Sequence, residues 1–159
     1  MIQARHVGRH DPWRDLYLAV VDELTVPDVS KVPRPFVLLL ALDIGDVDSS
    51  EMARFADEFL AVGGCVYVCT WGEGCEWLHD AFDEAFIRAV PEDRWDDEFV
   101  LTTWHDDEPL DEALWYAVFV AYNEPGVESV LAVASPEYAE HIERRFADVE
   151  QLSEDVVGE

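Results

Sequence analysis

The residue types best suited to catalysis are a cysteine and two histidines in the middle of the chain. Cys75 and His79 are four residues apart, so they would share one face of a helix. In the first turn of that helix the dipole lowers the pKa of a thiol, whereas the neighbouring Glu73 and Glu76 oppose thiolate formation. His105 follows a later predicted strand. Cys75, His79 and His105 are therefore candidate catalytic residues; the alternative is a half-buried cysteine and a solvated histidine.

The same side chains could instead bind a metal. Asp43, Cys75, His79 and His105 could together supply three or four ligands to zinc. Their spacing does not require such a site, and the sequence contains no CxxC motif. It also lacks a phosphate-binding GK[ST] loop. We therefore expect neither a bound metal nor a cofactor.

Aromatic and acidic side chains after three predicted strands indicate a binding surface. Asp43 follows the first of these strands, Trp71 and Glu73 follow the second, and Trp104 and His105 follow the third. Ligands of parallel sheets bind beyond the carboxyl ends of the strands, where these turns would meet. We expect the five residues to line one concave surface. The alternative is that the tryptophan rings simply pack across adjacent loops.

Strands and helices alternate along most of the chain. The continuous apolar run at residues 36–42 is typical of a strand that is buried on both faces. Further strands are predicted at residues 65–70, 99–103 and 129–134, each followed by a helical pattern. The alternation predicts an α/β three-layer sandwich with a four-stranded, mainly parallel sheet. We expect strands 36–42 and 99–103 to be adjacent at its centre.

The two ends of the chain give further expectations. Apolar residues recur at spacings of three and four from Arg14 to Leu24, which predicts an extra N-terminal helix. Three prolines make residues 25–35 a linker after that helix. Residues 151–159 are mostly polar and should be frayed. We expect residues 1–159 to form a single domain.

Charge excludes several classes of partner. The 159 residues include 36 acidic and 10 basic side chains, for a net charge of -26. Such a surface repels phosphate backbones and anionic lipids, so we expect neither nucleic-acid binding through a basic groove nor membrane binding. The acidity favours either solubility, as in a salt-rich cytoplasm, or attraction of a protein partner with a basic surface. Three cysteines without a secretion signal indicate reduced thiols in a cytoplasm.

Two segments carry a family resemblance: CTWGEGCEWLHDAFDE (residues 69–84) and TTWHDDEPLDEALWYA (residues 102–117). They resemble a family of short bacterial proteins of unknown function, whose members show CxWGxxCExxHD followed by TTWHxxExLxEALWF. Tyr116 departs from the final Phe of the second motif. The resemblance implies a bacterial cytosolic protein and assigns no activity.

Two main functions are open at this point. The first is a small acidic cytoplasmic binding or interaction module, a component of a bacterial protein complex, that acts through the strand-end surface. The alternative is a metal- or thiol-dependent hydrolase in the same crevice, which would need Cys75, His79, His105 and a carboxylate within mutual reach. A third hypothesis is that the chain mimics the charge of a nucleic acid and occupies a basic groove of another molecule. Whether the chain is an enzyme stays open.

Overall fold

The computed structural model describes residues 2–122 and 125–158, and in this part six strands form one mostly parallel sheet. The strands are β1 (Arg5–His10), β2 (Arg14–Val20), β3 (Phe36–Ala41), β4 (Cys65–Trp71), β5 (Leu101–His105) and β6 (Ser129–Ala134). Their order in the sheet is β1-β2-β6-β3-β4-β5, and β1 runs antiparallel to β2. The fold is α/β as expected, but the predicted four-stranded sheet is wrong because β1 and β2 extend it.

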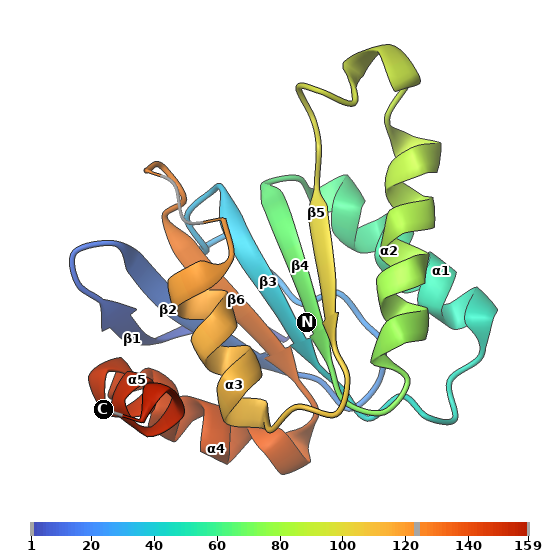
Figure 1. Cartoon of the computed structure of the whole chain (residues 1–159). Helices are drawn as coiled ribbons and strands as arrows, with labels where there is room; N and C mark the ends of the chain where they lie inside the picture. Colours follow the sequence, from blue (N-terminus) through green and yellow to red (C-terminus); the bar gives the residue numbers. More distant parts are fainter. Residues whose placement is uncertain (1, 123–124, 159) are drawn as a thin grey trace.

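Helices cover both faces of this sheet (Figure 1). One face carries α1 (Ser49–Val62) and α2 (Cys75–Ala89). The other carries α3 (Leu110–Trp115), a π-helical turn η2 (Tyr116–Val120), α4 (Pro136–Phe146) and α5 (Val149–Val157). The connection from α2 to β5, with the short helix η1 (Glu92–Arg94), projects beyond the sheet (Figure 1). Within the described ranges, no helix is long and apolar enough to cross a membrane.

The central strand is β3, and all six of its side chains are buried. Leu38 and Leu40 pack toward α1 and α2, whereas Val37 and Leu39 pack toward the opposite helices. The neighbours of β3 are β6 and β4. The expectation that strands 36–42 and 99–103 are adjacent is therefore wrong. After β4 the chain places β5 one position further out, and the next connection returns across the sheet to bring β6 against β3.

The predicted N-terminal helix at residues 14–24 is wrong, because this segment is β2 and the chain that follows it. Leu16 and Leu18 are buried on one face of the sheet, while Tyr17 and Ala19 pack on the other. An apolar run buried on both faces also contains the spacings of three and four that indicate a helix. The pattern alone cannot separate the two structures. Residues 25–35 form an irregular connection between β2 and β3.

The frayed tail expected at residues 151–159 is wrong for the part that the structure describes, because α5 runs from Val149 to Val157; residue 159 lies outside the described residues. The Asp148 carboxylate caps this helix by accepting a hydrogen bond from the Gln151 backbone N–H at 3.2 Å. Val149 and Leu152 are buried against the sheet-side core. These two buried side chains, the partly buried Val156 and the cap hold a helix whose other residues, apart from Val157, are polar.

A buried arginine links β2 to the end of η2. Arg14 is 4% exposed, and its guanidinium donates hydrogen bonds to the backbone carbonyls of Ala117 at 3.3 Å, Ala121 at 2.8 Å and Tyr122. Burial lowers the pKa of Arg14, whereas the carbonyls, which form the negative end of the helical segment, favour the cation. The guanidinium therefore replaces water for a group of carbonyls that helical hydrogen bonds leave open.

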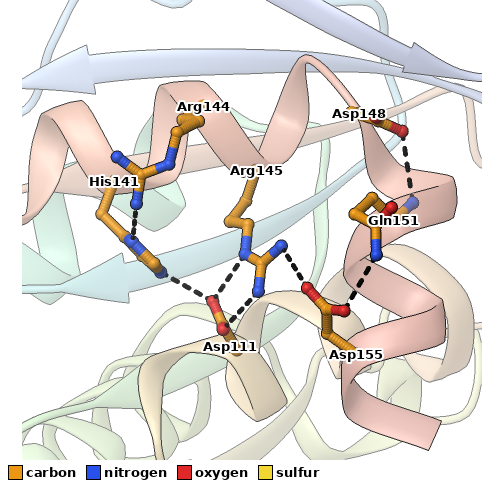
Figure 2. Close-up of polar contacts among 7 residues, drawn as sticks. All are labelled: Asp111, His141, Arg144, Arg145, Asp148, Gln151 and Asp155. Carbon is orange, nitrogen blue, oxygen red and sulfur yellow. Dashed lines mark hydrogen bonds and ion pairs between the residues drawn. The ribbon is translucent and has the colours of Figure 1, made fainter. Parts of the chain in front are cut away.

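A second polar network fastens α3, α4 and α5 to one another (Figure 2). Asp111 accepts hydrogen bonds from Arg145 Nη2 at 2.8 Å and from His141 Nε2 at 2.6 Å. Arg145 also forms an ion pair with Asp155 at 2.8 Å. The hydrogen bond from Arg145, followed by that from His141, outweighs burial and lowers the pKa of Asp111. Arg145, which lies on α4 and binds Asp111 of α3 and Asp155 of α5, thus joins the three helices.

Replacing Arg14 tests whether the guanidinium is structural. Arg14→Met keeps most of the side-chain volume but leaves the buried carbonyls without donors, so it should cost roughly 3 kcal/mol of unfolding free energy. Urea denaturation measures this loss. The matched control is Arg9→Met, which removes an exposed arginine and should leave stability nearly unchanged. Equal effects of the two substitutions would contradict the role assigned to Arg14.

The Asp111 network predicts a defined pH dependence. Because the folded pKa of Asp111 lies below its ordinary value of 3.8, its stabilising contribution is complete above that value and is lost as the pH falls through the folded pKa. Asp111→Asn should cost roughly 1–2 kcal/mol near pH 7, and its gap to the wild type should narrow as the pH falls below 3.8. Urea titrations at several pH values measure the gap. Asp97→Asn, at an exposed site, is the control, and a gap that persists at low pH would refute the assignment.

Candidate functional site

Three of the expected binding residues gather where β3 and β4 end. The Trp71 ring packs edge-on against Tyr138 at a centroid distance of 5.0 Å, and its indole N–H donates to the Glu108 carbonyl at 2.8 Å. Burial is the main cause of a raised Tyr138 pKa, and the carboxylates of Asp43 and Glu73 are among the nearby charges that raise it further. Asp43 and Glu73 therefore form a local acidic patch around Tyr138, and Trp71 packs on the same ring.

A small cavity lies beside this patch, where the strand order reverses between β3 and β6. Its volume is about 120 Å³, and its lining includes Asp22, Asp43, Glu51 and Ser135. The Asp43 backbone N–H donates to the Ser135 hydroxyl at 2.8 Å and so joins the segment after β3 to the start of α4. Pockets for drug-sized ligands and cofactors usually measure roughly 300–1,000 Å³. The switch point of this sheet is too small for a cofactor of that size.

The structure separates Trp104 from His105. Both belong to β5, and successive side chains of a strand point to opposite faces of the sheet. Trp104 is 48% exposed and packs on His79 of α2 at a centroid distance of 4.6 Å. His105 is 6% exposed and packs on Tyr116 at 4.7 Å, on the α3 face. The five residues expected to line one concave surface thus lie in three places.

On the α2 face, His79 belongs to a hydrogen-bonded chain. The Thr102 hydroxyl donates to the Asp83 carboxylate at 2.6 Å, so it accepts from His79 Nε2, which lies 2.9 Å away. His79 Nδ1 contacts Asp80 at 3.1 Å. Among the described residues, His79, Asp80 and Asp83 are the grouping whose donor atoms approach closely enough, within 4.8 Å, to hold a metal ion. Both ring nitrogens already have protein partners in this arrangement.

On the α3 face, His105 is held at both nitrogens. Its Nε2 lies 2.9 Å from the Thr103 hydroxyl, and its Nδ1 lies 2.8 Å from the Glu108 carboxylate. Hydroxyl, imidazole and carboxylate follow one another in the order that activates a nucleophile in some hydrolases. Here the Tyr116 ring covers the imidazole, and the Tyr116 hydroxyl lies 2.6 Å from that of Tyr67. This network ties the loop after β5 to the strand itself.

The expected catalytic set does not converge. Cys75 is 2% exposed, and burial, followed by the charge of Asp106, raises the pKa of its thiol. His79 and His105 lie on opposite faces of β5. The four zinc ligands considered from sequence, which add Asp43 to these three residues, are not brought together in the described part of the chain. The sequence did not show this separation, because the predicted strand ended at residue 103 and left His105 in the turn that follows, whereas His105 belongs to β5.

The family comparison agrees with the two sequence motifs. A family model described as "Domain of unknown function (DUF7684)" matches residues 16–149. The chain belongs to this family. The match spans both segments that carried the resemblance, residues 69–84 at the end of β4 and in α2, and residues 102–117 from β5 into η2. The resemblance to a family of unknown function is therefore confirmed. The comparison with curated proteins gave no match.

Sequence reasoning missed the most unusual surface of this DUF7684 protein. Four large apolar side chains are exposed together along β5, α2 and the connection between them: Ile87 (58%), Phe99 (54%), Leu101 (39%) and Trp104 (48%). We call these four residues and the groove beside them the β5–α2 surface. The groove has a volume of about 450 Å³, and its apolar lining includes Phe86 and Trp95. The apolar residues that follow the acidic segment PEDRWDDE were the available signal.

The placement of Trp104 and His105 predicts which of them stabilises this DUF7684 protein more. His105→Ala removes two hydrogen bonds and the ring beneath Tyr116, so it should cost roughly 2–3 kcal/mol. Trp104 is half exposed, and Trp104→Ala should cost only about 1 kcal/mol. Chemical denaturation of both variants measures the two values. A larger loss for Trp104→Ala would mean that the His105 network contributes little to the fold.

Proposed function

We propose that this DUF7684 chain is an acidic protein-interaction module that binds a partner through the β5–α2 surface. The observation that carries the proposal is the exposure of four large apolar side chains beside an edge strand of the sheet. Three of them, Ile87, Phe99 and Leu101, line one groove, and large exposed apolar patches mark interaction sites. We place the module in a bacterial cytoplasm, as a component of a protein complex.

The shape of the surface suits a protein ligand. The groove between the C-terminal half of α2 and the α2–β5 connection is open and apolar, and Trp104 stands beside it on His79. Aromatic side chains in partly enclosed apolar settings are the residues that most often dominate protein–protein affinity. Their acidic surroundings would supply the polar rim that such interfaces have.

Charge favours a partner with a basic surface. Residues 75–108, from α2 to the loop after β5, hold twelve acidic side chains and two basic ones. Both arginines already have acidic partners: Arg88 pairs with Asp57 at 2.8 Å and Arg94 with Glu98 at 3.5 Å. An uncompensated acidic rim speeds the encounter with a basic protein and discriminates against acidic ones.

The alternative, a metal- or thiol-dependent hydrolase, has weaker support. A thiol enzyme needs an accessible thiolate near a base, whereas Cys75 is buried and burial raises its pKa. A metal enzyme could use His79, Asp80 and Asp83, but a metal would have to displace the hydrogen bond between His79 and Thr102. No other observation favours the hydrolase over the interaction module.

Site-specific photo-cross-linking in the bacterium that carries the gene tests the proposal. Benzoylphenylalanine at position 87, which is 58% exposed on α2, should cross-link to one defined protein. The same residue at position 157, which is 55% exposed on α5, should give no such product and is the matched control. Leu101→Glu should reduce the cross-link from position 87 at least tenfold, because it places a charge on the exposed edge of β5 beside the groove that Ile87 lines.

The proposal fails if position 87 gives no product or the same products as position 157. It also fails if Leu101→Glu leaves the cross-link unchanged. Leu101 is partly exposed, so Leu101→Glu should fold, and an unchanged melting temperature would verify this.

A further inference from the structure

We propose that the partner supplies an extended, basic segment that pairs with β5 as a seventh strand of the sheet. This inference rests on the proposed function and specifies how the β5–α2 surface is used. Strand addition to an exposed sheet edge takes its affinity from backbone hydrogen bonds and its specificity from pockets for alternate side chains.

The backbone of β5 is available for such pairing. β5 pairs with β4 in regular parallel register over all five of its residues. Within residues 2–122 and 125–158, no strand pairs with its other side, so β5 ends the sheet. An edge strand presents a row of outward N–H and C=O groups that another extended chain can bind.

Side-chain sites lie on both faces of this edge. Trp104 packs on His79 and therefore belongs to the α2 face, where the apolar groove also lies. Leu101 pairs in register with Tyr67, whose side chain packs on the α3 face. Side chains of an added strand would alternate between the two faces. Because the groove and Trp104 lie on the α2 face, the occupant should carry apolar residues at the alternate positions that face α2.

The opposite edge of the sheet shows what a protected edge looks like in this protein. β1 carries two arginines, of which Arg5 pairs with Glu143 at 2.7 Å and Arg9 with Asp15 at 2.9 Å. Its register with β2 is interrupted between His6 and Gly8. Charges and irregular register are devices that prevent strand addition. β5 has regular register and exposed Leu101 and Trp104 instead.

Charge selects a basic segment over a second copy of this chain. Two β5 edges brought together would each contribute the twelve acidic residues of the 75–108 segment, in chains whose net charge is -26. Repulsion between these rims opposes a β5–β5 dimer, whereas Lys or Arg beside the apolar positions of a partner strand would be attracted.

A display library of random 12-residue peptides, selected on the wild-type protein at low salt, provides the probes. Enriched peptides should show apolar residues at alternate positions flanked by Lys or Arg. Their affinity should fall at least tenfold between about 50 mM and 500 mM NaCl, because salt screens exposed charges.

Methylating single backbone nitrogens of a selected peptide tests strand pairing directly. It should weaken binding tenfold or more at every second position and less than twofold at the positions between them, since only alternate amides face β5. Leu101→Glu should abolish binding, whereas Val157→Glu, at an exposed site on α5, should not.

The possible failures are distinguishable. Peptides that depend on Leu101 but tolerate methylation at every position would overturn strand addition while leaving the interaction module intact. Selection of no peptide, or of acidic peptides, would overturn the inference, and the cross-linking result would then decide the proposed function alone. A dimer found by analytical ultracentrifugation and lost in Leu101→Glu would make the second copy the occupant and overturn the basic segment.

Discussion

The central constraint on this structure is that β3 has apolar side chains on both faces. Every one of its six side chains is buried, so neither face of the sheet can be left to water. The chain meets this requirement with α1 and α2 on one face and α3, η2, α4 and α5 on the other. β6 and β4, which flank β3, share the two layers, and almost all of their side chains are buried as well. The remaining strands lie where these layers end.

The cover given by the two helical layers becomes incomplete at β5. Of its five residues, only His105 is buried, and Leu101 and Trp104 are exposed. At the other end of the sheet, β1 is equally uncovered but carries paired arginines. An apolar edge would promote self-association in a neutral protein. The acidic residues around β5 oppose this, so in the proposed function the same charges keep the free protein monomeric and attract a basic partner.

The sequence was sufficient where one pattern admits one structure. The apolar run at residues 36–42 is too short for a typical helix, which favours a doubly buried strand, and residues 129–134 form β6 with the predicted bounds. It was insufficient at residues 14–20, because a doubly buried strand also shows helical spacing. The third predicted strand ended at residue 103, whereas β5 continues to His105. That difference of two residues turns a loop histidine into a buried strand residue and divides the expected site.

The two histidines that suggested catalysis have a different physical role in this fold. His79 ties Thr102 to α2, and His105 ties Thr103 to the loop that contains Glu108. One anchor lies on each face of β5, and together they restrain the strand although its outer edge has no partner in the described residues. A restrained edge loses less conformational entropy when another chain pairs with it than a mobile edge would. In the proposed strand addition, the residues that first indicated a reaction would thus make β5 a more favourable template for binding.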